Sequence, residues 1–412
     1  MKVSVFTLGC KTNLYESQQI VAGLLKAGHD AKIGFFNADV FVLNTCAITA
    51  EAEKKSRQAI ARARKLNANC RVVVVGCASQ KNALQFSDIS NVTYVKGVHN
   101  KEEVVALLDC KGVHVEEIPS VYAHTINAVQ ERTRAFVKIQ DGCNNFCSYC
   151  IVPYLRGRSR SKDVDVVVNE VANANSNEVV LIGIDLSQYG KDNGSSLTEL
   201  FSKLQGLPVR IRLGSLEPNV VTDQMLTALA KLNFCPHFHL SLQSGCDSVL
   251  ARMNRHYTTQ TYFDAVQKIR KVFPNVAITT DVIVGFCGET DDEFETTCQF
   301  VEKVGFADVH VFPYSAREGT VAYNTMGDLP AETKKIRQEK LTAIKHQLHD
   351  KFIDSQLGKT EVVLAEQKKG GFWQGYTPNY TRVYFKGDVN QGDLVSVKLT
   401  RRYLDGAQGE LV

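Results

Sequence analysis

The sequence contains no apolar run near the roughly 18 residues that a membrane-spanning helix requires. Its N-terminal stretch, MKVSVFTLGC, also lacks the apolar core and the small-residue cleavage site of a secretory leader. We therefore expect a cytoplasmic protein with no membrane partner. Twelve cysteines in that reducing compartment favour metal or redox chemistry over disulfides. The formal net charge of +4 is compatible with an anionic partner but does not identify one.

The features of a structural zinc site are missing as well. Cys143, Cys147 and Cys150 lie within DGCNNFCSYC (141–150), but no second C-x-x-C pair follows and no histidine lies within ten residues. A structural zinc ion takes four ligands, and a cubane iron–sulfur cluster normally takes four cysteines. Three cysteines would leave one iron free to bind a substrate or cofactor. The alternative is that these cysteines pack as small buried hydrophobes.

The first part of the chain, residues 1–112, is predicted to be an α/β domain. Apolar runs at KVSVFTL, DVFVLNT (39–45) and RVVVVGC (71–77) predict buried strands, and the segments 15–26 and 50–66 between them predict helices. Continuous apolar strands separated by helices are typical of a doubly wound parallel sheet. Residues 113–134 have weak periodicity and predict a linker.

The middle part, residues 135–356, alternates six candidate strands with helices and ends in a long helix at 331–356. This pattern predicts a partial (β/α)6 barrel, short of the usual eight units. In such barrels the chemistry lies at the carboxyl ends of the strands, and the three-cysteine loop directly follows the first strand, 135–140. Residues 357–412 alternate apolar and polar positions between glycine-containing turns, which predicts a small antiparallel β-barrel.

Three further cysteines occupy equivalent positions in the first domain. Cys10, Cys46 and Cys77 each follow one of its predicted strands. Because the carboxyl ends of parallel strands meet at one edge of a sheet, where ligands bind, we expect these cysteines to converge. Each could instead be a buried core thiol, and the other six cysteines have no ligand-like spacing.

Several motifs together resemble the radical S-adenosylmethionine (SAM) methylthiotransferase family. They are the C-x-x-x-C-x-x-C loop after the first barrel strand and the stretches LGCKTN, VLNTCAIT, VVVVGCASQ, KIQDGCNNFCSYCIVPYLRGRSRS, SLQSGCDSVLARMNRHY, DVIVGFCGET and VFPYSAREGT. The resemblance implies an N-terminal methylthiotransferase domain, a radical SAM domain and a C-terminal TRAM domain that binds RNA. It also implies SAM and two [4Fe-4S] clusters, with Cys10, Cys46 and Cys77 holding one and Cys143, Cys147 and Cys150 the other.

Within this family, GCKTN and the long cysteine segment look most like the branch that modifies N6-threonylcarbamoyladenosine at tRNA position 37, beside the anticodon. The resemblance implies that a 5′-deoxyadenosyl radical takes hydrogen from carbon 2 of the adenine. The second cluster then delivers a methylated sulfur, and an external electron donor and a sulfur source are required. The alternatives are a methylthiotransferase of isopentenyladenosine tRNA or of a ribosomal protein. A non-catalytic, zinc-stabilised RNA-binding protein is the alternative of another class.

Polar residues and glycines at the later strand ends are candidates for binding SAM. Gln243 and Ser244 could bond the ribose or the carboxylate, Arg255 could pair with the carboxylate, and Glu217 could take a ribose hydroxyl or the amino group. Gly285 and Gly288, in VIVGFCGET, could let the backbone approach the adenosine part of SAM. The alternative is that these glycines only form a turn between a strand and a helix. Cys287 departs from the proline usual in the family. Asp185 stands where the family more often has asparagine, so no role is assigned to it.

Two basic segments are candidates for contacting RNA phosphates. The first is RGRSRSK, four basic residues without an acid just after the cysteine loop (Arg156, Arg158, Arg160, Lys162). The second is the basic helix after Cys46, with Lys54 and Lys55 near its start. For either segment the alternative is an ordinary solvated charged face.

Overall fold

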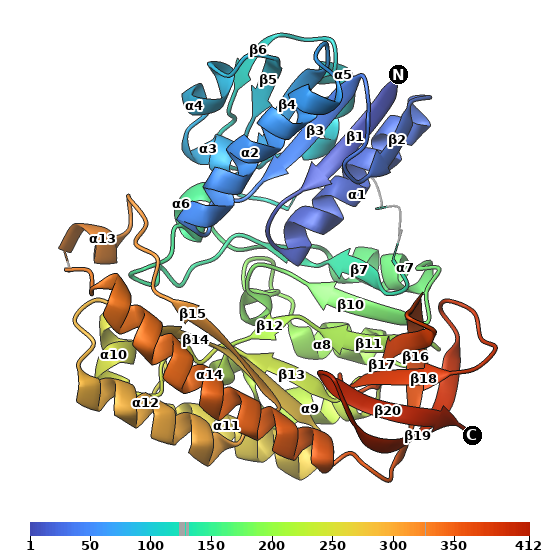
Figure 1. Ribbon diagram of the computed structural model, residues 1–412, viewed down its shortest axis with the longest axis vertical. Helices are drawn as coiled ribbons and strands as arrows, with labels where there is room; N and C mark the ends of the chain where they lie inside the picture. Colours follow the sequence, from blue (N-terminus) through green and yellow to red (C-terminus); the bar gives the residue numbers. More distant parts are fainter. Residues whose placement is uncertain (123–127, 129–131, 326) are drawn as a thin grey trace.

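The computed structural model describes residues 1–122, 128, 132–325 and 327–412 (Figure 1). We call 1–114 the N-terminal domain, 135–354 the central domain and 360–411 the C-terminal barrel. The sheet of the N-terminal domain extends to His114, two residues past the boundary expected from the sequence. The expected linker, residues 113–134, lies partly outside the described residues. Within the described residues, no helix is both long and apolar enough to cross a membrane.

The N-terminal domain is built on a six-stranded sheet with all strands parallel and the order β2-β1-β3-β4-β5-β6. Its strands are β1 (Lys2–Thr7), β2 (Asp30–Ile33), β3 (Val40–Thr45), β4 (Arg71–Gly76), β5 (Val92–Lys96) and β6 (Gly112–His114). Its helices are α1 (Lys11–Lys26), α2 (Ala50–Leu66), α3 (Cys77–Lys81), α4 (Leu84–Ser87), η1 (Lys101–Glu103) and α5 (Val104–Leu107). The three apolar strands expected from the sequence are β1, β3 and β4.

Helices cover both faces of this sheet, because alternate strand residues point to opposite sides. Phe41 and Leu43 pack with Ile60 of α2 on one face. On the other face, Val40 and Val42 pack with residues of α1 and α5. The doubly wound parallel sheet predicted from the sequence is confirmed.

The central domain has seven parallel strands in two sheets, with the orders β11-β10-β7 and β12-β13-β14-β15. They are β7 (Ala135–Lys138), β10 (Glu178–Ile182), β11 (Arg210–Leu213), β12 (Ser215–Leu216), β13 (His237–Leu240), β14 (Ala277–Val284) and β15 (Asp308–Pro313). The third expected strand is divided at Gly214 into β11 and β12, so the seven strands correspond to the six predicted ones. The partial (β/α)6 barrel is confirmed.

Helices cover the outer face of these sheets, and the inner face carries both polar and apolar side chains. The covering helices are α7 (Val164–Ala172), α8 (Leu197–Lys203), α9 (Asp223–Ala230), α11 (Thr259–Val272), α12 (Asp291–Val304) and α14 (Ala331–Asp354). Val137, Val179 and Ile211 belong to the core beneath them. Alternation along the strands therefore turns neighbours such as Phe136 and Arg212 toward the inner face.

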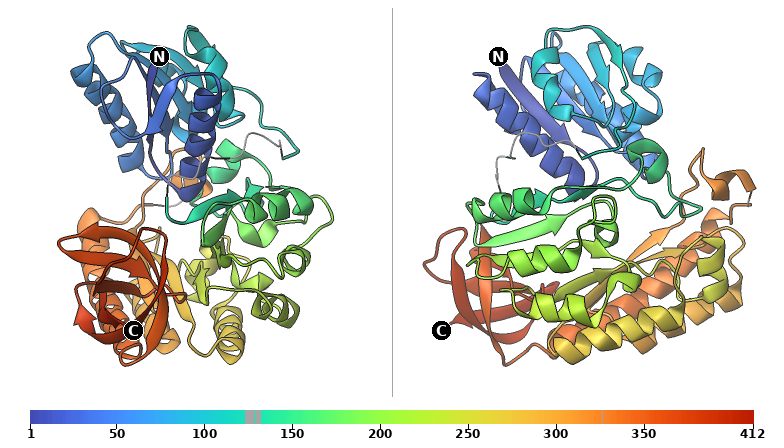
Figure 2. Two further views of the ribbon diagram at one scale, coloured as in Figure 1. Left: turned by 90° about the vertical axis from the view of Figure 1, so that its right-hand side faces the viewer. Right: turned by 180° about the vertical axis from the view of Figure 1, so that it is seen from behind.

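Short elements shape the ends of the central strands. They are β8 (Gln140–Asp141), α6 (Val152–Arg156), β9 (Arg160–Ser161), η2 (Leu186–Gln188), η3 (Pro218–Val220), α10 (Asp247–Arg252) and α13 (Val321–Thr325). The views of Figure 2 show the N-terminal domain above the central sheets and the C-terminal barrel beside these sheets, below the N-terminal domain.

The C-terminal barrel is closed, with the strand order β16-β17-β18-β20-β19. Its strands are β16 (Thr360–Lys369), β17 (Phe372–Tyr376), β18 (Arg382–Lys386), β19 (Leu394–Tyr403) and β20 (Gly406–Leu411). The predicted small barrel is confirmed, but it is not wholly antiparallel, because β18 and β20 run parallel. Trp373 lies in the barrel core, so its ring is not a free stacking surface.

Candidate active site where the three domains meet

The three-cysteine loop follows β8 and depends on a glycine. Gly142 has a φ of +72°, and a Cβ added there would lie 2.0 Å from the carbonyl oxygen of Arg158. Only glycine therefore suits this close approach of two backbone segments. The backbone N–H of Asn145 donates to Cys143 Sγ over 3.5 Å. Tyr149, before the last cysteine, packs edge-on against Phe286.

The thiols of this loop influence one another electrostatically. Burial first, and then the neighbouring Cys147, raise the pKa of Cys150 to about 12. Of the residues that the structure describes, neither cysteine trio brings all of its Sγ atoms within 4.8 Å of one another. Thiolates on one tetrahedral zinc ion, at ~2.3 Å from the metal, would lie roughly 3.8 Å apart. In each trio at least one pair of thiols is therefore farther apart than two thiolates on one zinc ion.

An arginine and a carboxylate complete the surroundings of this loop. Arg255 donates from Nη1 to Cys147 Sγ over 3.1 Å, and its Nη2 lies 2.6 Å from Glu217 Oε1. Asn145 donates from Nδ2 to Glu217 over 2.9 Å. Burial raises the pKa of Glu217 above its ordinary value although Arg255 opposes the shift. The structure thus brings the predicted residues Glu217 and Arg255 to the cysteine loop.

Asp185 also lies at this loop, although no role was expected for it from the sequence. Its carboxylate accepts from Asn145 Nδ2 over 2.9 Å and lies 3.9 Å from Cys143 Sγ. Burial raises the pKa of Asp185. Its place directly after β10, at the carboxyl end of a barrel strand, was the feature that could have identified it.

Two of the predicted SAM contacts are occupied by the protein itself. Ser244 is fully buried and its hydroxyl lies 3.1 Å from that of Thr297 on α12. The Gly285 amide donates to Glu289 over 2.7 Å, and a Cβ at Gly285 would meet Lys334 of α14 at 2.6 Å. Each of these polar groups already has a hydrogen-bond partner within the protein, and a role for Ser244 or Gly285 in binding SAM stays a prediction.

The other two predicted contacts keep accessible surface. Gln243 has a φ of +69° and is half-buried, with its backbone bonded to β14. Gly288 has a φ of +67° and open space where a side chain would be. The residue at the family's usual proline, Cys287, lies in a small core cluster with Phe286 and Tyr314.

Cys10, Cys46 and Cys77 follow β1, β3 and β4, which are neighbours in the sheet. Burial first, and then the nearby thiols of Cys77 and Cys10, raise the pKa of Cys46 to about 11. A Cβ at Gly9 would lie 2.7 Å from Cys46 Sγ. The structure therefore brings together the three cysteines that are far apart in the sequence.

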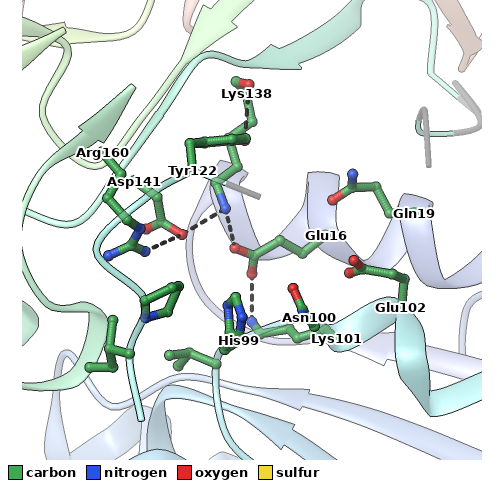
Figure 3. Close-up of a pocket in the computed structure, with 13 residues that line it drawn as sticks. Glu16, Gln19, His99, Asn100, Lys101, Glu102, Tyr122, Lys138, Asp141 and Arg160 are labelled. Carbon is green, nitrogen blue, oxygen red and sulfur yellow. Dashed lines mark hydrogen bonds and ion pairs between the residues drawn. The ribbon is translucent and has the colours of Figure 1, made fainter. Parts of the chain in front are cut away.

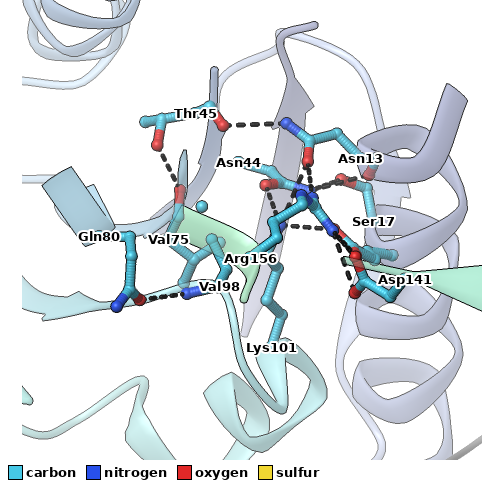
Figure 4. A network of polar contacts seen from close by, with 12 residues as sticks. Asn13, Ser17, Asn44, Thr45, Val75, Gln80, Val98, Lys101, Asp141 and Arg156 are labelled. Carbon is cyan, nitrogen blue, oxygen red and sulfur yellow. Dashed lines mark hydrogen bonds and ion pairs between the residues drawn. The ribbon is translucent and has the colours of Figure 1, made fainter. Parts of the chain in front are cut away.

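A buried polar network joins the two cysteine sites (Figure 4). Arg156, which follows the first cysteine loop on α6, donates to Asn13 Oδ1 over 2.7 Å. Asn13 in turn donates to the carbonyl oxygen of Thr45, directly before Cys46. Thr45 donates to the carbonyl of Val75, close to Cys77. One arginine thus ties α6 to the strand ends that carry the second trio.

Glu16 of α1 is the centre of the charge in this network. It accepts from Lys138 over 2.7 Å and from Arg156 over 2.8 Å, and it also pairs with Lys101. Asp141 pairs with Lys138 and Arg156 from the other side. Figure 3 shows Glu16, Lys101, Lys138 and Asp141 around a cavity of about 50 Å³. These ion pairs fasten the N-terminal domain to the central one.

The basic segment after the cysteine loop is therefore mostly structural. Arg156 and Arg160 are buried beside Asp141, and Lys162 is buried in an ion pair with Glu170. Only Arg158 of the four is exposed, with its guanidinium 4.4 Å from the Phe146 ring. The burial of Arg156, Arg160 and Lys162 argues against the expectation that all four contact RNA, and a contact of Arg158 with RNA stays a prediction. Lys54 is exposed on α2, as is Lys55.

A cavity of about 280 Å³ lies where the three domains meet. Its wall includes Cys10 and Lys11 of the N-terminal domain, Phe136 and Arg212 of the central domain, and Tyr380 of the C-terminal barrel.

On the inner face of β13, β14 and β15, three side chains bring metal-ligand atoms within 4.8 Å of one another. They are His239, Asp281 and His310.

The domain architecture matches known protein families. The model described as "Radical SAM superfamily" matches residues 137–301, and the model described as "Uncharacterized protein family UPF0004" matches residues 2–97. The solved structure of the radical SAM methyltransferase TsrM from Kitasatospora setae has a TM-score of 0.56 at 11% identity. The match covers 76% of this chain and 75% of that one. The fold and the three-cysteine loop define a radical SAM enzyme.

Full-length relatives identify the family. The chain is 35% identical to the threonylcarbamoyladenosine tRNA methylthiotransferase MtaB of Bacillus subtilis, over 100% of this chain and 96% of that one. It is 34% identical to the tRNA-2-methylthio-N(6)-dimethylallyladenosine synthase of Dictyoglomus thermophilum, over 100% of this chain and 98% of that one. The chain belongs to the radical SAM methylthiotransferase family and is an enzyme of that class.

Proposed function

We propose that this enzyme places a methylthio group on carbon 2 of N6-threonylcarbamoyladenosine at position 37 of tRNA. The observation that carries the proposal is the sequence similarity, over the full length of the chain, to a relative named for that reaction. Two cysteine trios at strand ends of adjoining domains support it. An unactivated aromatic C–H bond offers no group for acid or base catalysis, so cofactor chemistry is needed.

In this proposal, Cys143, Cys147 and Cys150 hold one [4Fe-4S] cluster and Cys10, Cys46 and Cys77 hold a second. When bound, the clusters and SAM supply the radical and the sulfur that convert the C–H bond into a C–S bond. Three ligands per cluster leave one iron of each without a protein ligand. Glu217, Arg255, Gln243 and Gly288 are the proposed contacts for SAM.

The protein's own groups prepare these sites. Arg255 donates to Cys147 Sγ and so places a positive charge beside a proposed metal ligand. The positive charge of Arg156 opposes the rise in the pKa of Cys46 that burial causes. Asn145 bonds both Asp185 and Glu217, which fixes the cysteine loop against two strand ends. Burial of Cys143 and Cys147 excludes water from the loop.

Exposed basic residues are the proposed contacts for the tRNA backbone. Arg158 lies next to the cysteine loop, and Lys54 and Lys55 lie on the helix after Cys46. Both positions follow a cysteine site in the chain, so phosphates bound there would lie close to the reacting centre. The electron donor and the sulfur source are external proteins or small molecules in this proposal.

The second candidate substrate is dimethylallyladenosine in tRNA, since a relative of that name is 34% identical over the whole chain. Mass spectrometry of tRNA nucleosides, from cells with and without the gene, separates the two. We expect the methylthio form of threonylcarbamoyladenosine to disappear when the gene is deleted. Loss of only the methylthio form of the dimethylallyl nucleoside would establish the second candidate instead.

A further inference from the structure

The cavity where the three domains meet has an unusual charge. Four basic residues line its wall, and none of the described residues that line it is acidic (Lys11, Arg132, Arg134, Arg212). Leu14, Phe136 and Val180 form the apolar part of the wall. Its volume of about 280 Å³ is close to the lower end, roughly 300 Å³, of cavities that hold small ligands. The wall is suited to a group that is anionic at one point and apolar beside it.

Two of the four cations are already neutralised inside the protein. Arg134 lies 2.7 Å from Glu366, and Arg212 lies 2.7 Å from Glu178. Both also lie over the Tyr380 ring, at 5.2 and 4.6 Å from its centroid. Their role is therefore to hold the tyrosine in place.

Tyr380 is placed in the cavity wall at a cost in backbone energy. Its φ of +68° is rare for a bulky residue, which indicates that surrounding contacts enforce the conformation. Its ring is stacked between His237 and Tyr376, with both centroids 4.7 Å away. The C-terminal barrel thus contributes a rigid wall to a cavity that reaches Cys10.

The other two cations lack such a partner within the described part of the chain. Among the described residues, neither Lys11 nor Arg132 forms an ion pair with a carboxylate, and both side chains are solvent-accessible. Lys11 is also the first residue of α1, so the positive end of the helix dipole lies at the same wall. Two uncompensated cations beside a helix N-terminus are suited to bind one anion.

We propose that this cavity binds the carboxylate of the threonylcarbamoyl group, through Lys11 and Arg132. The inference rests on the proposed function and extends it, because it names the part of the substrate that the enzyme selects. A dimethylallyl group has no charge and would leave both cations without a partner. The enclosed volume suits one small side group rather than a length of RNA backbone. The cavity therefore determines which modified adenosine is accepted.

The test compares two anticodon stem-loop RNAs, one with the threonylcarbamoyl group as the free acid and one with it as the methyl ester. The anaerobically reconstituted holoenzyme is assayed with each, and kcat/KM is measured for the wild type, Lys11→Met and Arg132→Gln. Lys26→Met is the matched control, because Lys26 is exposed at the far end of the same helix. Iron content is measured for each protein, since Lys11 adjoins Cys10.

We expect the wild type and Lys26→Met to prefer the acid by about tenfold or more, the effect of one charge-assisted contact. Lys11→Met and Arg132→Gln should each bring the acid-to-ester ratio close to one, and Lys11→Arg should restore part of the preference. Equal rates for acid and ester in the wild type would overturn the inference and leave the proposed function standing. Equal loss on both RNAs in the two variants would also overturn it, since that is the behaviour of a phosphate contact. If the wild type modifies neither RNA but modifies a dimethylallyladenosine stem-loop, the proposed function itself fails.

Discussion

The replacement Glu16→Gln tests whether the buried ion network fastens the N-terminal domain to the central one. Glu16 is 5% exposed and is the shared acceptor of Lys101, Lys138 and Arg156. Glutamine has the same shape but no charge, so Lys138 and Arg156 would keep Asp141 as their carboxylate partner. Lys101 would keep no carboxylate partner among the described residues. Breaking a buried charge pair by removing one partner costs about 3–5 kcal/mol. For domains of this size that corresponds to a fall in melting temperature of roughly 6–20 °C.

The assay is thermal unfolding of the metal-free protein at pH 7, with domain contacts followed by hydrogen exchange in the N-terminal domain. Asp350→Asn is the control, because that carboxylate is 58% exposed and pairs with Arg402 at the surface. An exposed pair contributes about 1 kcal/mol or less. If Glu16→Gln melts within a few degrees of the wild type, as the control should, the network does not fasten the domains and the reasoning is refuted.

Three further outcomes are expected. Cys147→Ala and Cys46→Ala should each lose about half of the roughly eight irons per chain. Only Cys46→Ala should still cleave SAM. Equal loss of SAM cleavage in both variants would contradict the assignment of separate roles. The hydrogen bond from Arg252 lowers the pKa of Glu293 to about 2. The stabilising effect of this hydrogen bond is therefore complete above the unfolded pKa near 4.5 and is lost as the pH falls toward 2. The difference in melting temperature between wild type and Glu293→Gln should shrink over that range. A difference that does not depend on pH would disprove this prediction. Arg158→Gln should weaken tRNA binding and reduce the slope of log affinity against log salt by about one, which a filter-binding titration measures; an unchanged slope would show that it makes no phosphate contact.

The sequence predicted the architecture well because the apolar runs are long and regular. β1, β3, β4 and the strands of the central domain are buried apolar segments, and their spacing fixed the order of the elements. The cysteine trios were visible for the same reason: once the strand ends are known, Cys10, Cys46 and Cys77 must share an edge. The parallel pairing of β18 with β20 could not be predicted, since alternation along a strand carries no information about its direction.

The basic segment after the cysteine loop shows what sequence patterns miss. It contains no acid, so it resembled an exposed phosphate-binding stretch. Arg156 is paired with Glu16, which lies 140 residues earlier in the chain. Local composition cannot show a counter-charge supplied by another domain. Lys162 differs, because its partner Glu170 lies in the same domain, on α7.

The cavity beside Cys10 was invisible for a related reason. Lys11, Arg132 and Tyr380 come from three parts of the chain, and none belongs to a local motif. Their meeting depends on how the C-terminal barrel and the N-terminal sheet both contact the central domain. Such sites arise from domain packing and become apparent only in the folded structure.

The central claim is best tested by one competition reaction. The reconstituted enzyme is given equal amounts of two tRNAs, one with threonylcarbamoyladenosine and one with dimethylallyladenosine at position 37, together with SAM, a reductant and sulfide. Mass spectrometry of the digested nucleosides measures each product. We predict the methylthio form of threonylcarbamoyladenosine as the main product. A main product on the dimethylallyl tRNA, or methylthiolation of neither, would contradict the account.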